Sequence, residues 1–358
     1  MSGATSNQPL RGDDAHLEWC HEAVQGVSRT FAITIQVLEE PMSSYICVGY
    51  LLCRIADTVE DASDIPPEEQ AGLLRQFDRV LDPEDETDVY DFEEDVSEWV
   101  PEPEERSDDW SVVANAPKVL RTFHALPEGA QRAIRPPARE LVRGMAMFVD
   151  RYAEEGGLRI ETREELEEYC YYAAGTVGIL ITNLVTREGV SERTEQRLYG
   201  TAESFGLLLQ LVNVAKDVYG DFTVENNVYL PAVWFEEEGI SQEELAVPEN
   251  QGAVTRVVQR TASHARRFLD DAQTYLEVVP ERDGNTLEAW AVPFLLAVGT
   301  LRELSARPED VADGTGVKVT REEVHAVMAA MASCEDRDEL GRYREIMAEQ
   351  PLHESSGI

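Results

Sequence analysis

The sequence predicts an all-α fold, built as a single helical domain over residues 1–358. Apolar residues recur at i, i+3, i+4 and i+7 through most of the chain, which is the period of a helix with one buried face. The alternation of apolar and polar residues that marks strands is nearly absent, and no repeat of fixed length is visible. Clear start and stop signals separate the periodic segments, so we expect a bundle of helices.

Several segments carry this helical period most clearly. The pair Pro66-Pro67 favours a helix start, because proline is tolerated in the first turn, where its missing N–H is not needed. Thr162 followed by Glu165 has the pattern of a capping box, in which two side chains satisfy backbone N–H groups at a helix start. The predicted helices cover residues 43–62, 66–81, 131–155, 163–187, 192–219, 251–278, 286–306 and 320–333.

Residues 82–110 differ from the rest of the chain, because acidic residues crowd them and three prolines interrupt them. They show no clear helical period, so we expect a solvated, mobile surface insertion. The D-x-D-like spacings in this segment suggest calcium binding as an alternative. The segment lacks the central glycine and the ligand pattern of an EF-hand loop, which favours the solvated insertion.

The net charge narrows the range of partners. The 358 residues include 70 acidic and 31 basic side chains, which gives a formal net charge of −39. Such a surface repels phosphate groups, which argues against binding nucleic acid or docking on anionic lipid. We favour a surface adapted to concentrated salt, as in a halophile, where ions screen the repulsion. A specialised acidic binding surface is the alternative.

The cysteines and the chain ends predict a cytoplasmic protein. The five cysteines are scattered and form no C-x-x-C pair, so we expect neither a zinc site nor a disulfide framework. The N-terminus has no apolar signal segment, and no stretch reaches the roughly 18 apolar residues of a transmembrane helix. Loose contact with a membrane surface stays open, as does the oligomeric state.

An acidic cluster interrupts an apolar helix in the segment GYLLCRIADTVEDASD. Asp57, Glu60 and Asp61 are three and four residues apart, which places their carboxylates on one helical face. Like charges so placed repel each other, and burial among apolar neighbours would cost stability without compensation. Arg54 precedes Asp57 by three residues and offers part of that compensation.

A second polar stripe lies in the segment GLLLQLVNVAKDVYGDF. Gln210, Asn213, Asp217 and Asp221 follow at spacings of three, four and four residues, so they line one face of a helix that is otherwise apolar. Lys216 lies beside this stripe. In so acidic a chain, a solvated helix face explains either cluster alone about equally well. A built site is favoured because both clusters interrupt apolar runs and the second combines amides with acids.

Two carboxylate stripes in a helical core suit magnesium, which prefers oxygen ligands and often bridges a few carboxylates to substrate phosphates. Stripes that face each other would hold such ions around a diphosphate. Neutralising this leaving group would let an allylic C–O bond ionise. The surrounding apolar helices would then house a hydrocarbon tail and keep water away from the carbocation.

Five sequence blocks resemble, in order, the squalene and phytoene synthase family, and are closer to its squalene synthases. The blocks are SRTFAITIQVL (28–38), ADTVED (56–61), LVRGMAMF (141–148), YCYYAAGTVGILIT (169–182), and QLVNVAKDVYGD (210–221) followed by VYLP (228–231). The resemblance runs from about residue 25 to residue 335. It implies the isoprenoid synthase helical bundle with a central active-site cavity.

The resemblance also implies a reaction and residue roles. Two farnesyl diphosphates would be joined head to head with Mg²⁺, through presqualene diphosphate, and NADPH would supply hydride to give squalene. Tyr169 would be the acid–base or cation-stabilising group. The implied metal ligands are Asp57, Asp61, Asp217 and Asp221, with Glu60 and Asn213 in support. The implied substrate contacts are Ser28, Arg29, Phe31, Tyr50, Arg54, Gln210, Asn213 and Lys216.

From the residues alone, several of these roles have alternatives. A tyrosine such as Tyr169 more often packs in a core, and Tyr171 and Tyr172 compete with it for any role. Ser28 also has the pattern of a helix N-cap. Gly175 and Gly178 indicate either close helix packing or room for a flat isoprenoid chain.

The chain departs from the family pattern near its second acidic motif. Asn226 and Asn227 stand where family members usually carry an arginine, which puts one diphosphate or cofactor contact in doubt. Lys216 also replaces an arginine, and keeps the charge but loses the bidentate fork. No G-x-G-x-x-G follows a strand, so an NADPH site would have to be built from helices. Lys318 is its candidate contact, with an ordinary surface lysine as the alternative.

The sequence is compatible with three functions, of which we favour squalene synthesis. Segments 289–301 and 316–324 resemble the reductive squalene synthases more than the phytoene branch. A phytoene or dehydrosqualene synthase, which stops without hydride transfer, is the alternative within the family. A non-catalytic, acidic helical protein that binds cations is the remote alternative.

Overall fold

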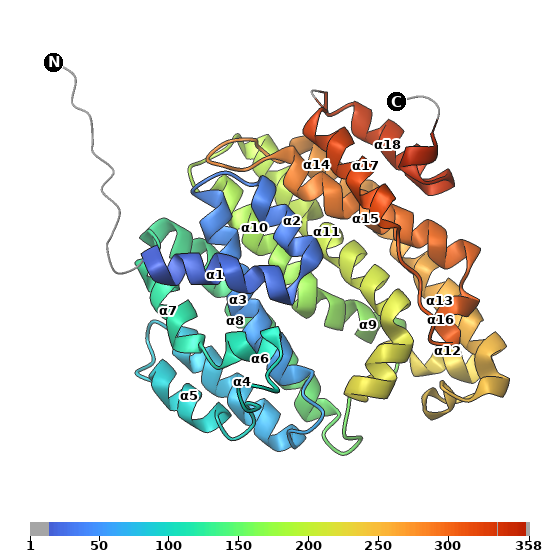
Figure 1. The fold of residues 1–358 in the computed structure, drawn as a ribbon, viewed down its shortest axis with the longest axis horizontal. Helices are drawn as coiled ribbons and strands as arrows, with labels where there is room; N and C mark the ends of the chain where they lie inside the picture. Colours follow the sequence, from blue (N-terminus) through green and yellow to red (C-terminus); the bar gives the residue numbers. More distant parts are fainter. Residues whose placement is uncertain (1–13, 335, 356–358) are drawn as a thin grey trace.

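The computed structural model describes residues 14–334 and 336–355, apart from the side chains of Asp14, Arg29 and Thr30. Helices make up the architecture of this part of the chain (Figure 1). The β-type pairing recorded there is one isolated parallel bridge, between Arg159 and Val228. The predicted all-α class is therefore confirmed.

The helices follow one another from the blue N-terminal half to the red C-terminal half (Figure 1). The first half contains α1 (Asp14–Val27), α2 (Arg29–Val37), α3 (Met42–Glu60), α4 (Pro67–Leu81), α5 (Val89–Val96), α6 (Asp108–Val113), α7 (Ala116–Ala125), α8 (Glu128–Arg151), α9 (Arg163–Cys170), the π-helical turn η1 (Tyr171–Gly175) and α10 (Thr176–Thr186).

The second half begins with the long helix α11. It contains α11 (Glu192–Gly220), the π-helical turn η2 (Asp221–Glu225), α12 (Ala232–Glu237), α13 (Gln251–Ala265), α14 (Leu269–Val278), α15 (Leu287–Ala306), α16 (Glu309–Ala312), α17 (Arg321–Ala332) and α18 (Glu339–Glu349). Short 3₁₀ turns are η3 (Gln242–Glu244), η4 (Pro248–Asn250), η5 (Arg266–Phe268) and η6 (Leu352–Glu354).

Two helices, α3 and α11, organise the bundle. The helix α3 packs against α1, α6, α7 and α8, whereas α11 packs against α10, α13, α14 and α15. Because α10 contacts both of them, it joins the two halves into one continuous hydrophobic core. The first predicted acidic stripe lies at the end of α3, and the second runs along α11 into the turn η2, so both are carried by the central helices.

Glycines let α10 approach α11 closely. A Cβ atom at Gly178 would lie 2.1 Å from the carbonyl oxygen of Ala202, and one at Gly206 would lie 2.2 Å from that of Ala174. Such distances exclude any side chain at either position. Of the two interpretations of Gly178, the structure supports close helix packing.

The acidic segment 82–110 is not the mobile loop that we expected. It contains α5 and the start of α6. Val89, Phe92 and Val96 are spaced as one helical face, and the last two are fully buried. The rings of Phe92 and Phe77 lie 5.1 Å apart, so α5 packs on α4. The crowded acids hid this short apolar stripe in the sequence.

Among the described helices, none is both long enough and apolar enough to cross a membrane.

Candidate metal and diphosphate site

The first acidic cluster lies on the last turns of α3. Oxygen atoms of Asp57, Glu60 and Asp61 all lie within 4.8 Å of one another, a spacing that one metal ion can bridge. Arg54 donates a hydrogen bond of 2.6 Å to Asp57 and another of 2.6 Å to the hydroxyl of Tyr50. The arginine therefore compensates one edge of the cluster, as its spacing predicts.

Burial makes this cluster unfavourable without a cation. Glu60 is only 3% exposed. Burial, followed by the charges of Asp61 and Asp57, raises its pKa well above the usual range. Burial and the charge of Asp57 likewise raise the pKa of Asp61. Because the ligand atoms are all carboxylate oxygens, the cluster fits a hard cation such as Mg²⁺.

Two stacked tyrosines cover this cluster. The Tyr169 hydroxyl donates to Glu60 over 3.2 Å, and that of Tyr229 donates to Asp61 over 3.5 Å. Their ring centroids are 4.7 Å apart. Burial and the nearby Glu60 and Asp61 raise the pKa of Tyr169, so its hydroxyl stays protonated at neutral pH. Tyr229 belongs to the VYLP block (228–231), but sequence analysis assigned it no role because it lies 168 residues from Asp61.

The neighbouring tyrosines point elsewhere. The hydroxyl of Tyr171 donates to Glu140 over 2.8 Å. The ring of Tyr172 packs over Gly144, where a Cβ atom would lie 2.1 Å from it. Of the three tyrosines, Tyr169 is therefore the one that contacts the acidic cluster.

The second acidic cluster lies at the C-terminal end of α11. Asp217 is 48% exposed at its side chain and forms an ion pair with Lys216. Asp221 is more buried, and burial, together with the charge of Asp217, raises its pKa to about 8. The charge of Glu60 also raises this pKa. The charges of the two clusters therefore influence each other.

Glu225 extends the second cluster, although sequence analysis did not select it. Its pKa is raised to about 8, mainly by burial and then by the negative charges of Asp221, Glu60 and Asp57. The π-helical turn η2 carries it, and such turns are frequent at functional sites. It continues the four-residue spacing of Asp217 and Asp221, but the predicted helix ended at residue 219, before this position.

Upstream on α11, Gln210 is half-buried and Asn213 is exposed. Neither amide has a hydrogen-bond partner within the described residues, so both are available to a ligand. They precede Asp217 on the same helix, as the predicted polar stripe requires.

Residues of α2 and its N-cap add polar and apolar groups beside the first acidic cluster. Ser28 caps this helix by accepting a hydrogen bond of 3.2 Å from the backbone N–H of Phe31. The Phe31 ring stacks on Tyr50 with centroids 4.2 Å apart, so an apolar surface adjoins the Arg54–Tyr50 pair. Arg29 begins α2, but its side chain lies outside the described residues.

Asp109, from the acidic insertion, also reaches this part of the site. Its Oδ1 atom lies 3.7 Å from Nε of Arg54, is buried and has no hydrogen-bond partner. Burial raises the pKa of Asp109, although the charge of Arg54 opposes this effect. The surrounding sequence gave no helical signal that would have placed Asp109 here.

Lys318 lies in the extended segment between α16 and α17. It is exposed and has no ion pair or hydrogen bond among the described residues. The same segment packs against α11, because a Cβ atom at Gly314 would lie 2.9 Å from the ring of Tyr219. Lys318 is therefore a free cation in a segment that contacts the helix of the second cluster.

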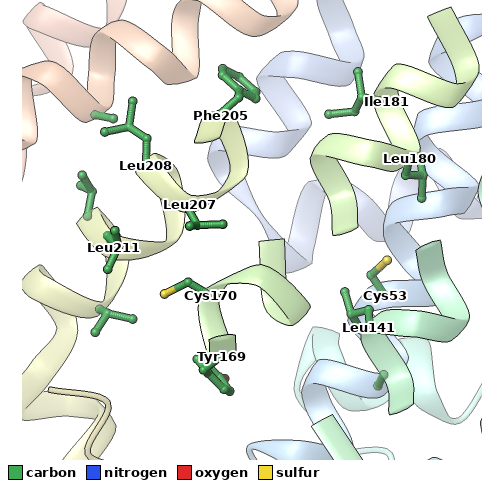
Figure 2. Close-up of a cluster of buried hydrophobic side chains, with 14 of the residues drawn as sticks. Cys53, Leu141, Tyr169, Cys170, Leu180, Ile181, Phe205, Leu207, Leu208 and Leu211 are labelled. Atoms are coloured by element: carbon green, nitrogen blue, oxygen red, sulfur yellow. The ribbon is translucent and has the colours of Figure 1, made fainter. Parts of the chain in front are cut away.

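Tyr169 lies in a cluster of buried, mostly apolar side chains (Figure 2). They come from α3, α8, α9, α10 and α11, and Tyr169 belongs to the same buried cluster. The labelled apolar residues are Cys53, Leu141, Cys170, Leu180, Ile181, Phe205, Leu207, Leu208 and Leu211. The hydrogen bond from Tyr169 to Glu60 links this apolar cluster to the first acidic cluster.

Comparison with known proteins agrees with this arrangement. The sequence matches the squalene/phytoene synthase family over residues 24–323. The chain belongs to this family. It is 28% identical to squalene synthase 1 of Arabidopsis thaliana over 80% of the chain, and 25% identical to squalene synthase of Schizosaccharomyces pombe over 84%. The chain spans 65% and 63% of the length of these curated relatives.

Solved structures show the same fold. TcSQS in complex with the ligand E5700 has a TM-score of 0.75 and 22% identity, covering 95% of this chain and 99% of that chain. A dehydrosqualene synthase in complex with a ligand has a TM-score of 0.60 and 21% identity, covering 91% and 98%. The predicted isoprenoid synthase bundle is therefore confirmed.

Proposed function

We propose that this chain joins two farnesyl diphosphates head to head, through presqualene diphosphate, and reduces the product to squalene with NADPH. The observation that supports the proposal most is a pair of carboxylate clusters, at the ends of α3 and α11, whose charges influence each other and the first of which Tyr169 contacts. The named squalene synthases among the relatives support this choice of reaction within the family.

Magnesium would be held by carboxylates of both clusters. Asp57, Glu60 and Asp61 would hold it at the end of α3, and Asp217 on α11 and Asp221 at the start of η2 would hold it from the other side. When bound, the metal would neutralise a diphosphate leaving group. Arg54, Tyr50 and Lys216 would contact the same diphosphate, with Ser28, Arg29, Gln210 and Asn213 as further contacts.

The chain's own residues would then control the carbocation. Phe31 would contact the isoprenoid chain beside Tyr50, since their rings already form one apolar surface. The protonated hydroxyl of Tyr169 would stay fixed toward Glu60, and its ring would face the developing positive charge. The apolar residues around Tyr169 would keep water from the cation.

The reductive half-reaction needs a hydride donor, which we propose is NADPH. Lys318 fits a contact with one of its phosphates, because this lysine is exposed and unpaired in a segment that packs against α11. The phosphate would form its ion pair there without displacing an acidic side chain.

Product analysis tests this proposal. The purified protein is incubated with farnesyl diphosphate and Mg²⁺, with and without NADPH, and the hydrocarbons are identified by mass spectrometry. We expect squalene only when NADPH is present. Dehydrosqualene whether or not NADPH is present would replace the proposal with the non-reductive alternative, and phytoene from a C20 diphosphate would indicate the phytoene branch. Absence of any prenyl product would contradict both.

A further inference from the structure

A short extended segment runs beside the loop that follows the second acidic cluster. The backbone N–H of Val228 donates to the carbonyl of Leu158 over 2.8 Å, and that of Ile160 donates to Val228 over 3.1 Å. The N–H of Leu158 donates to the Asn227 side chain over 2.8 Å. Segment 156–160 therefore holds segment 226–230 in a fixed register.

The side chain of Arg159 secures this pairing. It is only 8% exposed. Its guanidinium donates to the Asn226 side-chain oxygen over 2.7 Å and also to the Asn226 carbonyl. It donates further to the carbonyl of Leu158 over 2.9 Å and to Glu243 over 2.6 Å. Within the described residues, the guanidinium of Arg159 thus bonds only to the loop, to Leu158 and to Glu243, so Arg159 is not available to bind substrate.

Asn226 links the hydrogen bonds of Arg159 to the second acidic cluster. It ends the π-helical turn η2 in a left-handed conformation, with φ of 59°, that non-glycine residues seldom adopt. The next residue, Asn227, donates its backbone N–H to the carbonyl of Asp221 over 2.9 Å. The position of Asn226 therefore fixes the turn that carries Asp221 and Glu225.

Gly157 allows the two segments to approach. A Cβ atom at this glycine would lie 2.1 Å from the carbonyl oxygen of Asn226, the same atom that accepts a hydrogen bond from Arg159. Arg159 thus donates a hydrogen bond to the Asn226 carbonyl, and Gly157 leaves room for that carbonyl because it has no side chain.

The loop also reaches the first acidic cluster. The Asn227 side chain donates to the Tyr229 hydroxyl over 3.2 Å, and that hydroxyl donates to Asp61 over 3.5 Å. Displacing the loop would therefore disturb carboxylates of both clusters.

We propose that Arg159 is a positioning residue that holds the carboxylates of the two clusters in their metal-binding arrangement. It acts through the loop at residues 226–229, with Gly157 as its partner. The inference rests on the metal-binding part of the proposed function and not on the identity of the substrate.

Metal affinity measured without substrate tests this inference. Mn²⁺ replaces Mg²⁺ as a spectroscopic probe, and electron paramagnetic resonance counts the free ion during titration of the full chain. We expect R159Q and G157A each to weaken Mn²⁺ binding by about tenfold or more, the usual range for residues that orient metal ligands. R159K, which retains the charge without the planar fork, should fall between R159Q and the wild type.

Two control variants separate positioning from general loss of stability. R256Q removes an exposed ion pair with Glu238, and G72A places a methyl group in open space on α4. Both should bind Mn²⁺ as the wild type does. Titration at a temperature where circular dichroism shows every variant folded excludes unfolding as the cause of weak binding.

Wild-type Mn²⁺ affinity in folded R159Q and G157A would overturn the inference. If R159Q does not fold at any temperature, R159K and G157A decide the question in the same way. A wild-type protein that makes no squalene, combined with weakened Mn²⁺ binding in R159Q, would refute the proposed function and leave this inference standing.

Discussion

At the scale of single residues, the site concentrates more buried carboxylates than Arg54 and Lys216 can pair with. Asp221 has a pKa of about 8 in the folded chain, against an ordinary value of 3.8. Proteins retain such costly groups chiefly where function requires them, because an unpaired buried charge lowers stability. We therefore expect conservative replacement of these acids to stabilise the fold while it impairs the reaction.

The substitution D221N tests this trade-off. We expect it to raise the melting temperature of the metal-free protein near pH 8, because it removes a carboxylate that burial and Asp217 disfavour. It should lower the rate of product formation by at least about tenfold, since it would remove one of the proposed metal ligands. Calorimetry and the product assay measure the two effects, and a destabilised variant with full activity would contradict this interpretation.

The same residue predicts how stability depends on pH. A raised pKa means that the folded state binds a proton that the unfolded state releases, so the stability from Asp221 is complete below its unfolded pKa and is lost as pH rises through about 8. We expect the difference in unfolding free energy between wild type and D221N to become steadily less favourable to the wild type over this range. A difference that is constant with pH would show that Asp221 ionises normally.

The acids of the two stripes could be selected from sequence, because helical spacing alone aligns Asp57 with Asp61 and Asp217 with Asp221. Tyr229, Asp109 and Arg159 could not be selected. Each reaches the site, or its supporting loop, through tertiary contacts between segments far apart in the chain. No local spacing records such contacts.

At the scale of helices, the contact between α10 and α11 depends on glycine. We expect G178A to destabilise the protein by about 1–3 kcal/mol or more, because its methyl group would overlap the backbone of Ala202. The matched control is G200A on α11, where nothing lies within 4 Å, and helix propensity should make it neutral or stabilising by up to about 1 kcal/mol. Denaturant unfolding compares the two, and equal effects would disprove the close contact.

The helix α5 provides a second test at this scale. Phe92 is fully buried against Phe77, so F92A should cost about 3–5 kcal/mol of unfolding free energy. E94A, on the exposed side of the same helix, should change stability by about 0.5 kcal/mol or less. A harmless F92A would restore the original prediction of a mobile insertion.

Long helices with sustained apolar periods could be predicted from sequence, and each predicted segment is largely helical in the structure. Two of them are interrupted, however: η1 divides 163–187 into α9 and α10, and η5 divides 251–278 into α13 and α14. Short helices such as α5 and α12 could not, because two turns hold too few apolar residues to establish a period. The π-helical turns η1 and η2 also escaped prediction, because they shift the helical phase within an otherwise continuous pattern.

At the scale of the whole molecule, the formal charge of −39 should make stability depend on salt. We expect the melting temperature to rise by several degrees between about 0.1 M and about 2 M KCl, because added ions screen the repulsion between surface carboxylates. Differential scanning calorimetry at fixed pH measures this rise. A melting temperature that stays constant or falls would argue against adaptation to concentrated salt.

The cooperation of the two acidic clusters in one metal site is tested most directly by a double-mutant cycle on Mn²⁺ binding. D61N changes the cluster on α3, D221N changes the cluster on α11, and the third variant carries both substitutions. Shared ions predict that each single variant loses most of the affinity and that the double variant loses little more. Losses that add independently, or single variants that keep wild-type affinity, would show that the clusters do not form one site.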